Sequence, residues 1–257
     1  MQLAIYEKLG FLWKYGAEKT AHHKIGDHLL PMELVLSDPS IMRSFIENGC
    51  VGIDFQNMPE PVSVHLPFYD INIASGDPLH AAYSEQIIGE AITFASIRGI
   101  YSGVVHLGCN PKWPKKAFDN WYPTFLEAKE RIEKKAEEQG FQVIWENTYE
   151  QKLDMFSRIL SDHPNTKLCL DVGHVHCFSD FSVDDFIDRF GKNIVHLHLH
   201  NNFGDEDSHA ALPKGDGEWR KAINRLGDMS VETVVLEMNA ENVEKSETDI
   251  MWIIQQM

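Results

Sequence analysis

The chain of 257 residues is 43% hydrophobic and 24% charged, an ordinary globular composition that excludes a disordered or fibrous class. Its formal net charge of -16 argues against extensive binding of duplex DNA, because contacts to phosphates need Lys and Arg. No apolar run is long enough to span a membrane. Four cysteines form no Cys-x-x-Cys pair and follow no signal peptide, so we expect reduced thiols in a cytoplasmic protein.

Nine short apolar segments are predicted strands. In chain order they are residues 3–6, 32–36, 51–55, 62–66, 103–106, 143–146, 168–171, 194–200 and 234–237. Helices are predicted at residues 79–98, 120–139, 150–160, 183–190 and 217–226. This alternation indicates parallel strands with crossover helices. Eight such units close a (β/α)8 TIM barrel, which we predict as one α/β domain over residues 1–257.

Nine strands are one more than the barrel needs, and the surplus lies near the N-terminus. Either residues 3–6 form the first barrel strand, or residues 1–31 are an N-terminal extension and residues 32–36 form it. The spacing of residues 32–36, a helix and residues 51–55 favours the extension. No internal repeat, low-complexity tract or interdomain linker is found in the sequence.

A long connection follows the strand predicted at residues 103–106. It covers residues 109–122, CNPKWPKKAFDNWY, and contains two prolines and two tryptophans. Loops at a barrel mouth often carry function. The segment is therefore either a lid over the mouth or an ordinary surface loop with its aromatic side chains tucked down.

Residue types that bind metals stand at the ends of the predicted strands. They are His65, His106, Glu146, Asp171 with His174 after it, His198 among three histidines of residues 194–200, and Glu237. In a parallel barrel these strand ends converge on one mouth. One such residue is usually a hydrogen-bonded core residue or a helix cap, but packing does not explain six successive strands that end this way. Buried carboxylates repel one another without cations, so we predict a metal centre.

These segments resemble the AP endonuclease family 2 branch of the xylose isomerase-like TIM barrels, which includes endonuclease IV and many sugar isomerases and epimerases. The resemblance runs from about residue 32 to the C-terminus. The matching segments are VHLPFYDINIAS with His65, VVHLG with His106, ENT with Glu146, D-x-x-H with Asp171 and His174, HLHN with His198, DSH with Asp207 and His209, and the final Glu237.

The resemblance implies nine ligands around three zinc ions. One ion would take Glu146, Asp171, His198 and Glu237, the second His65 and His106 with Glu146 as a bridge, and the third His174, Asp207 and His209. These ligands suit Zn²⁺, with Mn or Fe as alternatives, at about one to three ions per chain.

The chain departs from the family pattern at Asn201, where Asp is usual, and at Phe68, where Tyr is usual although Tyr69 follows. The spacer between His209 and Gly215 is also longer than expected. The basic and aromatic loops that endonuclease IV inserts into DNA are not found. The resemblance therefore supports the metal centre better than a DNA substrate.

Three other histidines lie close to this ligand set in the sequence. His196 and His200 share a strand face with His198, so either is a candidate to support the ligands, although packing in the barrel is the commoner role. His176 follows His174 by two residues and is an alternative ligand.

Three functions fit this centre. The preferred hypothesis is hydrolysis of a phosphoester by a metal-activated water that Glu146 or Glu237 orients. The alternative is isomerisation or epimerisation of a small sugar or sugar phosphate at one ion held by Glu146, Asp171, His198 and Glu237. A non-catalytic barrel that binds a metal or metabolite is the third. The substrate is expected to be small and phosphorylated or sugar-like, and the sequence does not indicate the oligomeric state.

Overall fold

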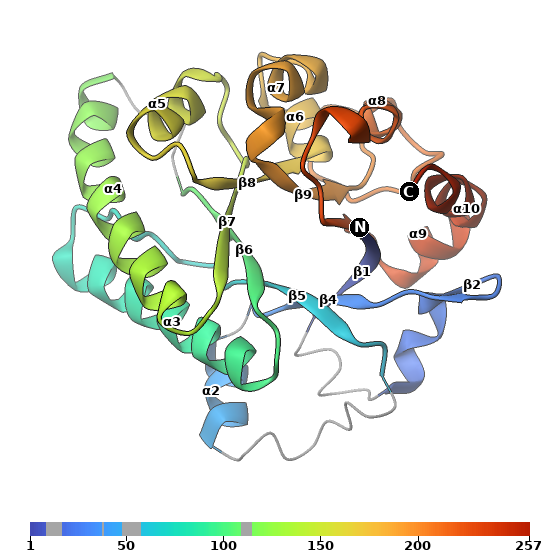
Figure 1. Ribbon diagram of the computed structural model, residues 1–257, viewed down its shortest axis with the longest axis horizontal. Coiled ribbons are helices and arrows are strands. Elements are labelled where there is room, and N and C mark those ends of the chain that lie inside the picture. Colours follow the sequence, from blue (N-terminus) through green and yellow to red (C-terminus); the bar gives the residue numbers. More distant parts are fainter. Residues whose placement is uncertain (9–16, 38, 48–57, 109–114) are drawn as a thin grey trace.

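Eight parallel strands form a closed barrel in the computed structural model, which describes residues 1–8, 17–37, 39–47, 58–108 and 115–257 (Figure 1). The order of neighbours is β1-β10-β9-β8-β7-β6-β5-β4. The strands are β1 Gln2–Lys8, β4 Met32–Val35, β5 Pro61–His65, β6 Ser102–His106, β7 Gln142–Glu146, β8 Lys167–Asp171, β9 Ile194–Leu199 and β10 Thr233–Leu236. The predicted (β/α)8 fold is confirmed.

Helices surround the barrel on the outside, as Figure 1 shows. The α-helices are α2 Pro39–Glu47, α3 Pro78–Ile97, α4 Lys115–Glu137, α5 Asp154–Asp162, α6 Val172–Phe178, α7 Val183–Phe190, α8 Trp219–Asn224, α9 Ala240–Lys245 and α10 Glu247–Gln256. Short 3-10 helices are η1 Ala17–His23, η3 Gly191–Asn193 and η4 Leu226–Asp228, and β2 Lys24–Ile25 pairs with β3 His28–Leu29 in a small hairpin. Within the described residues, no helix is both long and apolar enough to cross a membrane.

The first strand of the barrel is β1, so the interpretation of residues 1–31 as an extension is wrong. Its backbone pairs with β10 on one side, where Ile5 opposes Leu236, and with β4 on the other, where Ile5 opposes Met32. A strand bonded along both edges closes the sheet and cannot be an appendage. The predicted strand at residues 51–55, which favoured the extension, lies outside the described residues.

The long connection after β6 is shorter than the sequence suggested. Helix α4 begins at Lys115, and residues 109–114 lie outside the described residues. The indole of Trp121 stacks on Phe125 with ring centroids 4.7 Å apart, and the Tyr122 hydroxyl donates to Asp162 at 2.9 Å. Trp121, Tyr122 and Phe125 are buried, so the aromatic side chains at residues 121 and 122 pack within the fold and do not form part of a lid.

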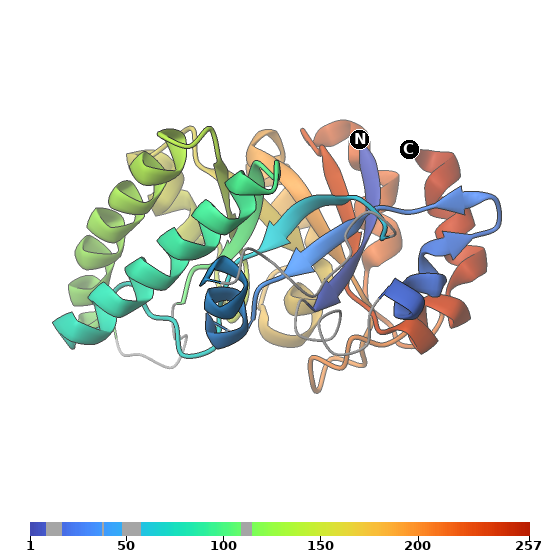
Figure 2. The same cartoon turned by 90° about the horizontal axis from the view of Figure 1, so that it is seen from below.

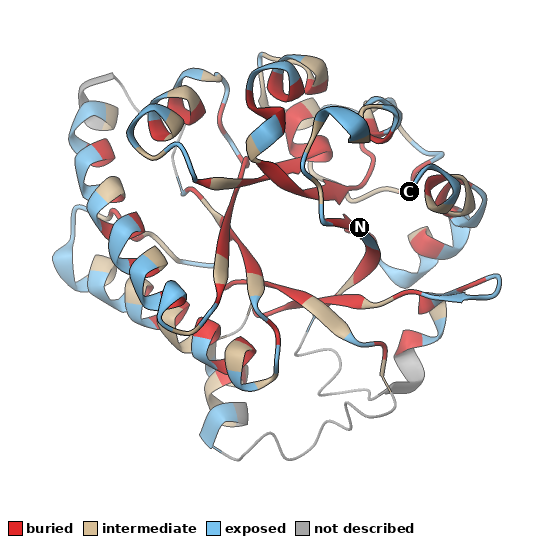
Figure 3. Ribbon diagram, viewed as in Figure 1, coloured by how far each residue is buried: buried red, intermediate tan, exposed pale blue. Residues whose placement is uncertain are grey.

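All the barrel strands point the same way, so their carboxyl ends lie on one side, the lower side in Figure 2. The strands are the most buried part of the fold (Figure 3). Val104, Ile144 and Cys169 share strand faces with His106, Glu146 and Asp171, because strand side chains alternate. These three side chains are buried in one hydrophobic cluster, which lies one layer below the strand ends.

The contact between β5 and β6 leaves no room for a side chain at Gly103. A Cβ there would lie 2.7 Å from Val64 Cγ2 and 3.0 Å from its carbonyl oxygen. We expect Gly103→Ala to lower the free energy of unfolding by about 1–3 kcal/mol, as overpacking does. Gly89→Ala in α3 is the matched control, since its Cβ would meet nothing, and should stabilise by about 0.5–1 kcal/mol. Denaturant unfolding measures both, and equal effects would contradict this packing.

Candidate metal centre

The structure brings all nine predicted ligands together at the carboxyl end of the barrel. Six lie at or just beyond the ends of β5 to β10, at His65, His106, Glu146, Asp171, His198 and Glu237. His174 stands in the first turn of α6, and Asp207 and His209 lie in the connection from β9 to α8. The structure describes their positions, and their roles as metal ligands are our proposal.

Three carboxylates surround one nitrogen of a buried imidazole. His198 Nδ1 lies 2.9 Å from Glu146 Oε1, 3.2 Å from Glu237 Oε1 and 3.8 Å from Asp171 Oδ2. Asp171 accepts the amide of His174 through Oδ1, whereas its buried Oδ2 has no hydrogen-bond partner. An orphaned carboxylate oxygen aimed at other donor atoms fits a divalent ion, so these four residues could hold one.

The second oxygen of Glu146 faces a different pair of histidines. Glu146 Oε2 lies 3.2 Å from the Nε2 atoms of both His65 and His106. The other nitrogen of His65 bonds the carbonyl of Leu66 at 2.9 Å, which leaves Nε2 free to donate its lone pair. Glu146 is therefore placed to bridge two ions, the role that the family resemblance implies.

A third group is built around Asp207. Its Oδ2 lies 3.3 Å from His174 Nε2 and 3.2 Å from His209 Nε2. Each ring binds a carbonyl with its other nitrogen, His174 to Asn147 at 2.9 Å and His209 to Glu237 at 2.7 Å. Histidines that bind metals are commonly oriented in this way. His209 also has a φ of 45°, a strained conformation that persists where the surroundings fix it.

The buried carboxylates and histidines of the centre shift one another's pKa values. Burial opposes ionisation of Glu146, yet the His198 and His106 rings hold its pKa well below the usual range. Burial would lower the pKa of His209, but Asp207 and Glu237 raise it to about 9. Likewise Asp171 and Asp207 outweigh burial and raise the pKa of His174 well above its ordinary value. The carboxylates thus favour positive charge beside them, and divalent ions would supply the same positive charge as these protons.

Glu33 is a further residue of the centre that sequence reasoning missed. It is fully buried on β4, where Oε1 lies 3.0 Å from His198 Nε2 and Oε2 lies 3.0 Å from His196 Nε2. The Ser63 hydroxyl donates to Oε2 at 2.7 Å. Burial would raise the pKa of Glu33, but the His198 and His196 rings hold it well below its usual range. A carboxylate behind His198 holds that ring and leaves Nδ1 for a metal. The available signal was one Glu inside the apolar segment MELVL.

The other histidines divide between support and surface. His200 Nε2 lies 3.3 Å from Asp171 Oδ1, and its ring stacks on His209 with centroids 4.2 Å apart, so it supports two of the ligands. His196 contacts Glu33. His176 instead pairs with the exposed Asp216 at 2.9 Å, and therefore lies apart from the ligand groups.

Two of the departures from the family pattern, Asn201 and Phe68, have structural roles. Asn201 Oδ1 accepts the amides of Asn202 and Gly217, and thus ties down the connection that carries Asp207 and His209. The ring of Phe68 packs edge-on against His65 with centroids 5.0 Å apart. Each residue therefore shapes the surroundings of the ligands.

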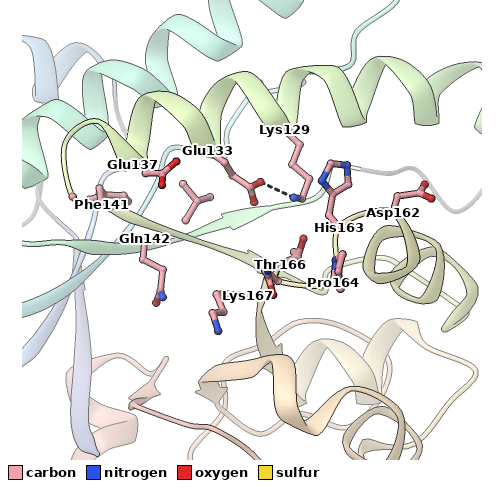
Figure 4. A pocket seen from close by; sticks show the side chains of 13 residues that line it. Lys129, Glu133, Glu137, Phe141, Gln142, Asp162, His163, Pro164, Thr166 and Lys167 are labelled. Carbon is pink, nitrogen blue, oxygen red and sulfur yellow. Dashed lines mark hydrogen bonds and ion pairs between the residues drawn. The ribbon is translucent and has the colours of Figure 1, made fainter.

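A cavity of about 560 Å³ opens above the ligands. Its lining includes His65, His106, Glu146, His174, Asp207, His209 and Glu237, together with Tyr6, Phe68, Tyr69 and Tyr149. This size suits a small molecule. A second cavity, of about 600 Å³, lies beside α4, where Lys129 pairs with Glu133 at 2.7 Å (Figure 4). It reaches Gln142 and Lys167 at the starts of β7 and β8, so it lies at the end of the barrel that usually serves stability.

We expect Glu33→Gln to weaken metal binding about 10–100-fold, because the amide keeps the shape but removes the charge behind His198. Competition with a chromophoric chelator measures the affinity, and circular dichroism checks the fold. Glu232→Gln, an exposed change at the opposite end of the barrel, is the control. An unchanged affinity in Glu33→Gln would show that this carboxylate does not act on the centre.

The comparisons with known proteins agree with this architecture. Two uncharacterized proteins of Methanocaldococcus jannaschii are 26% and 24% identical over 68% and 60% of this chain. The matches span 62% and 61% of those relatives, so the chain covers less than two thirds of their length.

Solved structures resemble nearly the whole chain. A protein from Thermus thermophilus soaked with ZnCl2 has a TM-score of 0.76 and 21% identity, with 100% of this chain and 99% of that chain covered. A D-tagatose 3-epimerase-like protein has a TM-score of 0.75 and 19% identity, with coverage of 99% and 97%. The 3-keto-D-glucoside 4-epimerase of E. coli has a TM-score of 0.69 and 14% identity, with 99% of each chain covered.

At these identities the structural likeness establishes the fold alone. A family model carries the assignment further, because it matches residues 56–256 and is described as a xylose isomerase-like TIM barrel. The matched residues include all nine candidate ligands and most of the chain. The chain therefore belongs to the xylose isomerase-like TIM barrel family.

Proposed function

We propose that the protein is a metal-dependent isomerase or epimerase of a small sugar or sugar phosphate. The observation that carries the proposal is the placement of Glu146 at the end of β7 and of Glu237 directly after β10. Both carboxylates approach His198 Nδ1, and both line the same cavity. Strands β8 and β9 separate the two residues around the barrel, so they reach the cavity from different sides.

Two carboxylates on different sides of a substrate suit proton transfer at one carbon. An ion held by Glu146, Asp171, His198 and Glu237 would polarise neighbouring hydroxyl and carbonyl oxygens when bound. One glutamate would then take the proton from the carbon beside the carbonyl. The other would return a proton to the opposite face of that carbon, which inverts its configuration. Phe68, whose ring stacks on His106 at 4.9 Å, supplies an apolar wall that limits access of water.

The structural neighbours support epimerisation over hydrolysis, which was the preferred hypothesis from the sequence. Two of these neighbours are described as a D-tagatose 3-epimerase-like protein and a 3-keto-D-glucoside 4-epimerase. The cavity of about 560 Å³ also has room for a monosaccharide.

Hydrolysis of a phosphoester remains the second candidate, because one observation favours it. His65 and His106 at Glu146, and His174 and His209 at Asp207, offer more ligand groups than one ion needs. Two or three clustered ions would activate a water and stabilise the charge that develops on phosphate oxygens.

We expect Glu237→Gln to lower turnover of a ketose or ketose phosphate about 10²–10⁴-fold, because the amide cannot move a proton. Exchange of a substrate C–H proton with deuterated solvent, followed by NMR over a panel of such sugars, measures the step. Glu241→Gln on the exposed face of α9 is the control. Full activity in Glu146→Ala would contradict both the epimerase and the hydrolase proposals.

His106→Ala separates the two candidates, because this residue contacts Glu146 only through Oε2. An epimerase that uses the ion at His198 should keep most of its turnover, while a hydrolase should lose the second ion and its activity. Elemental analysis before and after the substitution counts the ions per chain. Loss of sugar turnover together with retention of one ion would contradict the single-ion epimerase.

A further inference from the structure

A second cluster of potential ligands lies outside the centre, at the carboxyl end of β1. Glu7 is the penultimate residue of that strand, and His22 and His23 end the 3-10 helix η1. Glu7 Oε1 lies 2.6 Å from His22 Nε2 and 3.3 Å from His23 Nε2. The three side chains are between 0% and 7% exposed. Burial of two imidazoles on one carboxylate oxygen places three donor atoms around a single point.

The proton on His23 can be assigned from its other contact. Nδ1 lies 3.0 Å from the carbonyl oxygen of Leu30, which can only accept, so Nδ1 carries the proton. Nε2 of the same ring lies 3.3 Å from Glu7 Oε1. A ring nitrogen and a carboxylate oxygen this close need positive charge between them, which either a second ring proton or a metal ion supplies. The backbone of Leu30 also donates to the carbonyl of His23 at 2.9 Å, which fixes the ring in this position.

We propose that Glu7, His22 and His23 bind one divalent transition-metal ion, Zn²⁺ by its ligand chemistry. Two histidines with one glutamate are a common zinc ligand set. In a tetrahedral site with bonds of about 2.0–2.1 Å, neighbouring donor atoms are about 3.3 Å apart. His23 already has this separation from Glu7, and His22 would move outward by a fraction of an ångström. The bond of His23 Nδ1 to a carbonyl is the support that metal-binding histidines usually have.

The fourth coordination position has space beside it. A cavity of about 220 Å³ is lined by Glu7 and His22 together with Tyr6, Lys8, Met238 and Asn239. Water or a small anionic ligand could therefore complete the coordination, with Lys8 as an additional positive group. Three protein ligands with an open fourth position are typical of a zinc ion that remains accessible.

This site is separate from the centre above the barrel but adjoins it. Tyr6 and Asn239 line both cavities, and the Tyr6 ring lies 6.2 Å from the ring of His209. An ion here would fasten η1 to the end of β1 at the rim of the mouth. The inference goes beyond the proposed function, because none of its ligands belongs to the nine and neither candidate reaction uses them.

Metal counting on the full chain tests the inference. After saturation with Zn²⁺ and removal of the excess, elemental analysis should find one ion fewer in Glu7→Gln and in His22→Ala than in the wild type. His28→Ala is the matched control, because this histidine is exposed in the next hairpin strand and should leave the count unchanged. The ion should also persist in His106→Ala, which alters only the other centre.

A crystallographic measurement keeps the test independent of how the variants fold. The wild-type protein with saturating Zn²⁺ should give an anomalous-scattering peak at the zinc edge between Glu7, His22 and His23. The absence of that peak, or an equal zinc count in folded Glu7→Gln and His22→Ala, would overturn the inference. The cluster would then be an ion pair in which a proton occupies His22 or His23.

Discussion

The carboxylate of Glu146 is the point on which the centre depends. It is fully buried at the end of β7, where one oxygen faces His198 and the other faces His65 and His106. A buried carboxylate is costly unless positive charge surrounds it. Either protons on the surrounding imidazoles or metal ions bound by those imidazoles would supply this charge. Asp171, Asp207 and Glu237 increase the amount of positive charge that the site requires. The arrangement of side chains at the barrel mouth therefore follows from the need to neutralise these buried carboxylates.

Two of the barrel strands that carry these side chains are not perfectly regular. The register shifts between Met32 and Glu33 on β4, and again between Leu168 and Cys169 on β8. Irregularities of this kind redirect side chains, and they are common beside active sites. The first precedes the carboxylate that supports His198, and the second precedes Asp171. Gly173 contributes in another way, because a Cβ there would lie 1.9 Å from the ring of His200.

Much of this arrangement could be predicted from the sequence, because parallel strands bring their carboxyl ends together. This rule alone predicts that His65, Glu146 and Glu237 lie close together. Glu33 could not be placed, since its partner His198 is far away in sequence and its role depends on register. The first strand was misjudged for a related reason: pairing along both edges of β1 is tertiary information. Helix α6 was also missed, because Asp171 caps it within a segment that contains glycine and histidines.

The parts of the centre differ in what holds them. Glu146, Asp171, His198 and Glu237 stand at strand ends, and a closed barrel fixes their positions. Asp207 and His209 depend instead on a connection that Asn201 and Gly217 fasten by a few hydrogen bonds. A change in that connection would alter the third ligand group and spare the first. Within this fold, the closed barrel therefore fixes the first candidate ligand group, whereas the third depends on the connection after β9.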